Sequence, residues 1–238
     1  MSRTTAFRYA LKARFGLLNL IPKGDGQIHH FHVPGDRLGS RNGWYILHLD
    51  DLATGIYGSW KAGDSQTWSS REPRDYQEVE QVRQRIQLAR QKRENDQHRH
   101  QQAVAEYANR LWHEARPAAT HPYLIAQGID GHGLRKTGDT LLVPMIRDGE
   151  LVNLQRIRPN GSKRFLSGGM VEGCSALIGV ITPGQPLYIA ESFATGATIH
   201  EETGAAVACT MTAGNLLEAG RRLQRQHPDA VLIVAGDS

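Results

Sequence analysis

The chain has 238 residues, 39% of them hydrophobic and 22% charged, a globular composition that is long enough for one large domain or two small ones. A net charge of +4 and a pI near 9.2 fit a protein that meets polyanions, because Lys and Arg neutralise phosphates. Only two cysteines are present, which excludes a four-cysteine zinc ribbon. No apolar run is long enough for a signal peptide or a membrane span, so we expect a cytoplasmic protein with no membrane partner.

Residues 1–70 are predicted to form a small β-rich module. The apolar runs Ile28–Val33, Gly43–Leu47 and Gly55–Trp60 are separated by Gly, Asp and Asn, which indicates antiparallel strands joined by turns. Its aromatic side chains are expected to form the core, with base stacking as the alternative. They are Trp44, Tyr45, Tyr57 and Trp60.

Three histidines of this module invite a metal hypothesis. His30 and His32 are two residues apart on a predicted strand and would share a face, with His29 beside them. Because no cysteine lies near them, a structural role is favoured.

Residues 71–116 are predicted to form a charged helical connector. No Gly or Pro occurs from Asp75 to Arg116, and Arg90–Gln102 lacks an apolar stripe, so that stretch is expected to be solvated. Its cations could follow a DNA backbone, but interspersed acidic residues favour a solvated spacer. The cations are Arg83, Arg85, Arg90, Lys92, Arg93, Arg99 and His100, and the acids are Glu80, Glu94 and Asp96.

Residues 117–183 are predicted to contain a β-hairpin and a second turn. Leu141–Ile146 and Leu151–Gln155 flank the turn Asp148-Gly149, and Pro159-Asn160-Gly161 follows. Four cations near the second turn are expected to contact template or nucleotide phosphates, with simple solubilising charge as the alternative. They are Arg156, Arg158, Lys163 and Arg164.

Residues 184–238 show the alternation of apolar strands and helices that is typical of a parallel sheet. The buried strands Leu187–Ala190, Ala205–Cys209 and Ala230–Ala235 alternate with two helices, one after Ser192 and one starting near Asn215, which gives βαβαβ. We expect Cys174 and Cys209 to be small buried hydrophobic residues.

Polar residues follow each of these strands, at the edge where ligands of open parallel sheets bind. Glu191 follows the first strand and Asp237 the third, so on neighbouring strands their carboxylates would lie close and could share Mg²⁺ or Mn²⁺. This predicts phosphoryl-transfer chemistry. Thr212 and Asn215, at the start of the second helix, are expected either to cap it or to approach a phosphate.

The strings Tyr188–Gly196 and Val231–Ser238 resemble the two signature motifs of the Toprim domain. The resemblance implies that Glu191 is the acid/base and metal-organising glutamate and that Asp237 is the first aspartate of the Mg²⁺-binding pair. The second aspartate would come directly after Ser238. We therefore expect this polypeptide to be catalytically incomplete.

Upstream strings resemble the subdomain that precedes Toprim in primases of phages and mobile plasmids: His121–Leu124, Gly131–Arg135, Leu142–Met145 and Gly161–Gly169. The resemblance implies a DNA primase that makes short RNA primers on single-stranded DNA from NTPs, with a replicative helicase as a domain or partner. The sequence itself has no P-loop motif. The alternatives are a Toprim-type metal-dependent nuclease and a non-catalytic single-stranded DNA-binding or assembly fragment.

The fold class expected from these patterns is α+β. It comprises an N-terminal antiparallel β module, a helical connector, a primase-type hairpin subdomain and an incomplete Toprim-like sheet, in that order along the chain.

Overall fold

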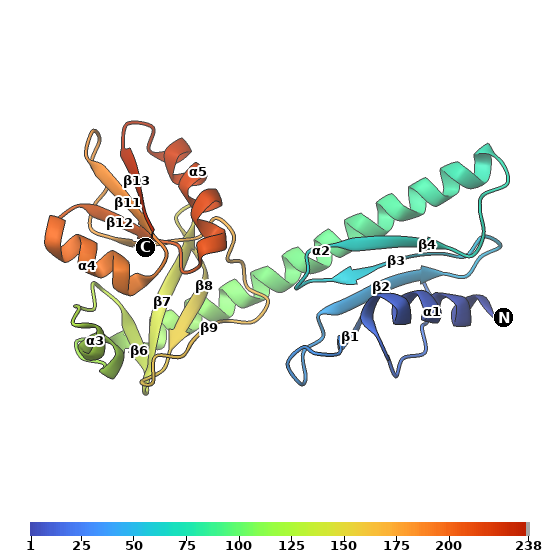
Figure 1. Ribbon diagram of the computed structural model, residues 1–238, viewed down its shortest axis with the longest axis horizontal. Helices are drawn as coiled ribbons and strands as arrows, with labels where there is room; N and C mark the ends of the chain where they lie inside the picture. Colours follow the sequence, from blue (N-terminus) through green and yellow to red (C-terminus); the bar gives the residue numbers. More distant parts are fainter. Residues whose placement is uncertain (237–238) are drawn as a thin grey trace. The chain divides into compact units, whose positions relative to one another are not determined.

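The computed structural model describes residues 1–236 and divides into two compact units, Met1–Gln97 and a second that begins at His98 (Figure 1). The described residues form helices and three separate sheets, which confirms the mixed α+β class. The domain boundaries at residues 70, 116 and 183 stay predictions. No helix in the described part of the chain is both long enough and apolar enough to cross a membrane.

The first unit contains the expected antiparallel sheet. Its four strands pair in chain order, β1-β2-β3-β4, as the Gly-rich turns between the apolar runs predicted. The strands are β1 (His29–Phe31), β2 (Gly43–His48), β3 (Thr54–Ser59) and β4 (Ser65–Ser69).

The helix α1 (Arg3–Phe15) covers one face of this sheet and was not expected from the sequence. The Ser2 hydroxyl caps its N-terminus by accepting a hydrogen bond from the Thr5 amide. Phe7 and Leu11, one turn apart, are its only fully buried residues. Phe7, Leu11 and Phe15 follow one another at intervals of four residues, so the sequence does contain an apolar helical stripe that pattern analysis missed.

The long helix α2 (Tyr76–Glu114) is confirmed, and its first part belongs to the first unit. Ala89 is 4% exposed and packs against Trp44, Ile46 and Ile56. These strand residues alternate with those beneath α1, so the two helices lie on opposite faces of the sheet (Figure 1).

The expectation that Arg90–Gln102 is solvated throughout is wrong at Arg93. The Arg93 guanidinium lies 5.6 Å from the ring centroid of Trp44 and 5.8 Å from that of Trp60. A cation packed on aromatic faces can bury a helix where no apolar residue is available. Composition alone does not show this.

The second unit begins with the last part of α2, which a five-stranded antiparallel sheet of order β5-β6-β7-β8-β9 follows in the chain. The predicted hairpin is confirmed as β7 and β8, and its turn residues Asp148 and Gly149 have φ of 52° and 82°. The strands are β5 (Arg116–Pro117), β6 (Arg135–Thr137), β7 (Thr140–Arg147), β8 (Glu150–Ile157) and β9 (Lys163–Phe165). The short helix α3 (Pro122–Gln127) lies between β5 and β6 in the chain.

The last sheet has the order β10-β12-β11-β13, and β11 pairs in parallel with both of its neighbours. This confirms the predicted βαβαβ arrangement; the antiparallel edge strand β10 was not predicted. The elements are β10 (Ala176–Ile178), β11 (Pro186–Ala190), α4 (Phe193–Thr203), β12 (Ala206–Cys209), the 3₁₀ turn η1 (Ala213–Asn215), α5 (Leu216–Gln226) and β13 (Val231–Ala235).

One hydrophobic core joins the two sheets of this unit. Val143 and Met145 of the hairpin lie in the same cluster as Cys174, Phe193 and Cys209. Both cysteines are fully buried, as expected, and burial raises the pKa of the Cys174 thiol to about 11 and that of Cys209 to about 12. The five-stranded sheet is therefore a fixed platform beside the parallel sheet.

Candidate functional site

Glu191 lies at the carboxyl end of the central parallel strand. β11 and β13 are neighbours, with Ala190 opposite Ala235, as the predicted site requires. The Glu191 side chain is partly exposed, and within residues 1–236 its carboxylate has no hydrogen-bond or ion-pair partner. Directly after it, the Ser192 hydroxyl caps α4 by accepting from the Thr195 amide. As far as the described residues go, the Glu191 carboxylate is therefore available to a ligand.

Asp237, the other predicted metal ligand, lies outside the described residues. Within the described residues no group of three or more His, Cys, Asp or Glu side chains could hold a metal ion. The carboxylate of Glu191 is the hard oxygen donor that Mg²⁺ prefers, and Mg²⁺ commonly uses only one or two protein carboxylates. The Mg²⁺ or Mn²⁺ site therefore stays a prediction, and Glu191 is the one predicted ligand that lies within the described residues.

Asn215 has a different task from the predicted one. Its side chain is 4% exposed, and its amide nitrogen donates to the carbonyl oxygens of Cys174 and Thr210, both at 2.9 Å. Its amide oxygen accepts from the Gly173 amide at 2.7 Å. Since these bonds occupy the amide inside the protein, Asn215 fastens the loop before β10 to the end of β12 and is not free to bind a nucleotide. Thr212 is partly exposed and makes no side-chain capping bond.

The strand register separates the four predicted phosphate contacts. Arg156 on β8 is directly opposite Arg164 on β9, and Ile157 is opposite Lys163. Cross-strand partners share a face and consecutive residues alternate, so Arg156 and Arg164 lie on one face and Lys163 on the other. Within the described residues, none of these cations, nor Arg158, forms an ion pair with a carboxylate.

Register also adds three cations that sequence analysis did not single out as binding residues. Arg135 on β6 is in the row of Arg156 and Arg164, with the β7 residue Leu142 between them. Arg116 and Lys136 are in the neighbouring row, which ends at Lys163. Arg135 lies 21 positions before Arg156, and Arg116 lies 20 positions before Lys136 and 47 before Lys163, so strand pairing brings these residues together.

The histidines of the first unit are used structurally. The His29 ring stacks on Tyr45 with centroids 5.2 Å apart, and His30 accepts from the Trp60 indole at 3.4 Å. The Nδ1 of His32 is 3.0 Å from a backbone carbonyl oxygen. Each ring therefore has its own protein partner, which supports the structural role over the metal site.

The aromatic residues of that unit form its core, as expected. Trp44 and Tyr45 are 1% exposed and Tyr57 6%, while Trp60 packs against Trp44 with ring centroids 5.6 Å apart. Buried rings cannot stack on bases. The structure therefore does not support the base-stacking alternative for Trp44, Tyr45 and Tyr57, whereas Trp60 is partly exposed.

Part of the basic helix face points into the first unit. Arg85 donates to the Leu52 carbonyl at 3.1 Å and lies 2.6 Å from Asp50, and Lys92 donates to the Gly26 carbonyl at 2.7 Å. With Arg93 on the tryptophans, these cations fasten helix to sheet. At these three positions the cations are therefore neither solvated, as the spacer hypothesis expected, nor arranged as a path for DNA.

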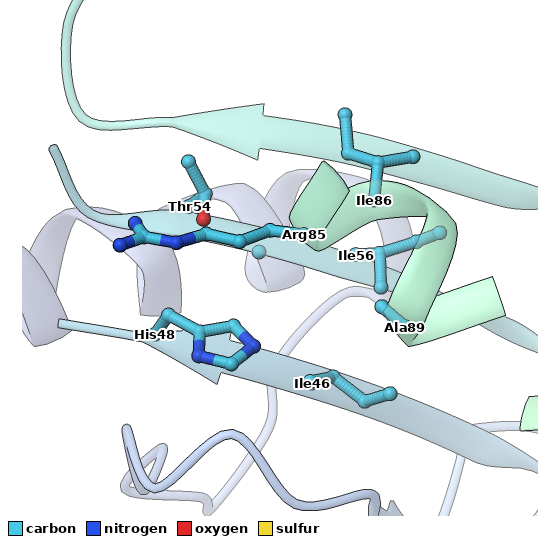
Figure 2. Close-up of a pocket in the computed structure, with 8 residues that line it drawn as sticks. Ile46, His48, Thr54, Ile56, Arg85, Ile86 and Ala89 are labelled. Atoms are coloured by element: carbon cyan, nitrogen blue, oxygen red, sulfur yellow. The ribbon is translucent and has the colours of Figure 1, made fainter. Parts of the chain in front are cut away.

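A hollow of about 200 Å³, part of it open to solvent, lies between β2, β3 and α2 (Figure 2). Burial, together with nearby Arg85, lowers the pKa of His48, which favours a neutral imidazole. The Thr54 hydroxyl beside it is buried and has no hydrogen-bond partner among the described residues. Isoleucines complete the walls, so the hollow is mostly apolar and does not resemble an anion site.

Comparison with known proteins identifies relatives for this arrangement. A protein named DNA primase TraC from Escherichia coli is 28% identical over 228 residues, covering 91% of this chain and 21% of the relative. A second protein of the same name and organism is 30% identical over 230 residues, covering 91% of this chain and 16% of the relative. The chain is a relative of DNA primase TraC. No family model matches it, and no solved structure matches it.

The similarity to TraC confirms the predicted resemblance to plasmid primases. Because it covers 91% of the chain, it must include parts of both units, the N-terminal module as well as the two sheets beyond it. The chain spans about a fifth of the length of these relatives. The activity, substrates and partners of the whole protein are therefore matters for proposal.

Proposed function

We propose that this chain is part of a DNA primase that makes short RNA primers on single-stranded DNA during plasmid or phage replication. The observation that carries the proposal is the Glu191 carboxylate at the end of β11, beside β13, which has no partner among residues 1–236, in a chain similar to TraC over 91% of its length. In this proposal the sheet β10-β12-β11-β13 is the first part of a Toprim domain.

The proposed reaction joins nucleotides by attack of a primer 3′-hydroxyl on the α-phosphorus of an NTP, with pyrophosphate as the leaving group. Glu191 and Asp237 would hold Mg²⁺, which supplies stabilisation of the negative charge on the reacting triphosphate. Glu191, when not bound to metal, can also accept the proton of the 3′-hydroxyl. The remaining contribution of the protein is to position template and nucleotide.

The cations of the five-stranded sheet are the proposed contacts for phosphates of template or nucleotide. These contacts are Arg156, Arg158 and Arg164, which have no carboxylate partner among residues 1–236, so their charge is available to a polyanion. Lys163, whose ammonium lies 5.3 Å from the ring centroid of Tyr123, is not one of them. Thr212 stays a candidate nucleotide contact because its hydroxyl is partly exposed. A replicative helicase is the expected partner, since it would expose the single strand that is primed.

The test is primer synthesis on single-stranded DNA with Mg²⁺ and labelled NTPs, with TraC as the positive control. It compares the chain, a chimera in which the next segment of TraC follows Ser238, and each with Glu191→Gln. Short labelled RNA that requires Glu191 supports the proposal. If TraC is active and the chimera folds but makes no RNA, primer synthesis is refuted, and shortened DNA in the same reactions would indicate a nuclease.

A second candidate, a non-catalytic single-stranded DNA-binding fragment, is favoured by one observation. The cation rows are complete within the described residues, whereas only one of the predicted metal ligands is. This candidate predicts salt-sensitive DNA binding that Glu191→Gln leaves unchanged, with no RNA product from either polypeptide.

A further inference from the structure

Arg156 and Arg164 form a like-charged pair across neighbouring strands. They are direct partners in the β8–β9 register, so their Cβ atoms are about 5 Å apart. No carboxylate or other side chain within residues 1–236 neutralises either guanidinium. Like charges placed opposite one another destabilise a sheet. The pair is unfavourable unless an anion lies between the two groups.

Arg135 extends this pair into a row. It lies two strands from Arg156, across Leu142, which is fully buried. The Arg135 guanidinium is 5.1 Å from the ring centroid of Trp112 and donates to the Trp112 carbonyl at 2.9 Å. These contacts hold the group in place before any ligand binds. With strands about 4.8 Å apart, the row from β6 to β9 is roughly 14 Å long, which a few nucleotides of single strand can span.

The row is on the face of the sheet that packs against α2. Leu142, in the row itself, and Leu154, two residues before Arg156, are in the same cluster as Ala108 of α2 and Ala115, which directly follows that helix. The cations therefore lie at the border of a rigid helix-on-sheet layer. A backbone bound there would meet fixed positive groups, not a mobile loop.

Lys163 precedes Arg164 in the chain but belongs to the other face. Its ammonium lies 5.3 Å from the ring centroid of Tyr123, in α3, and its cross-strand partner is the buried Ile157. This contact gives Lys163 a local structural role. Two adjacent cations on one strand thus have different surroundings, which makes Lys163 a matched control for Arg164.

We propose that Arg135, Arg156 and Arg164 bind the phosphodiester backbone of single-stranded DNA where it crosses strands β6 to β9. A phosphate between Arg156 and Arg164 accepts hydrogen bonds from both guanidiniums and converts their repulsion into attraction. This inference deepens the proposed function, on which the identification of the anion as template DNA rests. The simpler alternative is that cations on the edge strand β9 only prevent edge-to-edge association.

The experiment measures binding of a fluorescein-labelled oligo-dT to the full chain by anisotropy at several salt concentrations. We expect Arg156→Gln and Arg164→Gln each to weaken binding about fivefold or more and to reduce the salt slope by about 0.7 per lost phosphate contact. Lys163→Gln is expected to change the affinity less than twofold. Equal effects of Arg164→Gln and Lys163→Gln, or no effect of either, would overturn the proposal.

Arg164→Glu separates DNA binding from folding. It replaces the like-charged pair with a cross-strand ion pair to Arg156, so thermal stability should stay the same or rise while oligo-dT binding falls at least as far as in Arg164→Gln. Undiminished binding by a folded Arg164→Glu variant refutes the proposal.

Primer synthesis, assayed on the chimera, distinguishes this inference from the proposed function. If oligo-dT binding depends on the row but no RNA is made, the DNA contact stands and the primase proposal fails. If a chimera with both Arg156→Gln and Arg164→Gln makes primers at the rate of the unchanged chimera and needs no higher concentration of template, the primase proposal stands and the row is not the template contact.

Discussion

Asn215→Ala should destabilise the second unit by an amount that the structure allows us to work out. The substitution removes three hydrogen bonds of 2.7 to 2.9 Å and leaves the Gly173 amide and the carbonyls of Cys174 and Thr210 without that partner. At about 1 kcal/mol net for each bond, the loss is about 3 kcal/mol. For a protein of this size that corresponds to a fall in Tm of roughly 6 to 12 °C.

Differential scanning calorimetry is the suitable assay, because two units can unfold in separate transitions that one optical signal would merge. The matched control is Asn160→Ala, since the Asn160 side chain accepts one hydrogen bond, from the Ser162 amide, in an exposed turn. It should change stability by no more than about 0.5 kcal/mol. If Asn215→Ala costs less than about 1 kcal/mol but weakens nucleotide binding, the original interpretation of Asn215 as a ligand contact is right and the structural one is wrong.

Three further predictions follow from contacts at other places in the chain. Gly196→Ala should lower the free energy of unfolding, measured in urea, by about 1 to 3 kcal/mol despite the better helix propensity of Ala, because the new methyl group would overlap the Cys209 sulfur. Adding Cys209→Ala should restore part of this loss, and the absence of any restoration would contradict this packing. Hydrogen bonding to Arg71 lowers the pKa of Glu78 to about 2, so the stabilisation that this ion pair gives to the start of α2 is complete above about pH 4.5 and is lost as the pH falls toward 2. The helix content of the wild type and of Arg71→Gln should therefore differ at pH 7 and converge near pH 2. A difference that stays constant with pH would be inconsistent with this ion pair. Cys174 and Cys209, buried with raised thiol pKa values, should resist iodoacetamide at pH 8 and react in urea; rapid alkylation of the native chain would show that the core is open.

The elements that sequence predicted well are those whose signal is local. The absence of Gly and Pro from Asp75 to Arg116 predicts α2, and Asp148-Gly149 between apolar runs predicts the β7–β8 hairpin. The apolar runs near Leu187, Val207 and Leu232 predict the parallel strands and so the place of Glu191 at the end of one of them. In each case neighbouring residues carry the pattern.

The features that only the tertiary structure decided are contacts between residues that are distant in the chain. α1 packs through Phe7 and Leu11 against a sheet that forms later in the sequence. The polar middle of α2 is held by Arg93, which packs on tryptophans about 50 and 30 residues away. Asn215 is a polar residue in a loop at the ligand-binding edge of the sheet, which in sequence suggests a ligand contact. Its side-chain hydrogen bonds to Gly173 and Cys174 show that it connects two segments of the chain.

Contacts with residues distant in the chain also give Lys163 and Arg164 different roles. In the sequence they are one basic dipeptide, and the alternation of a strand places one against Tyr123 and the other opposite Arg156. The sequence by itself determined most of the helices and strands, with α1 and β10 as exceptions, and that the chain carries excess positive charge. The pairing of strands across long separations decided which of those charges share a face, because register is set by packing and not by the local sequence.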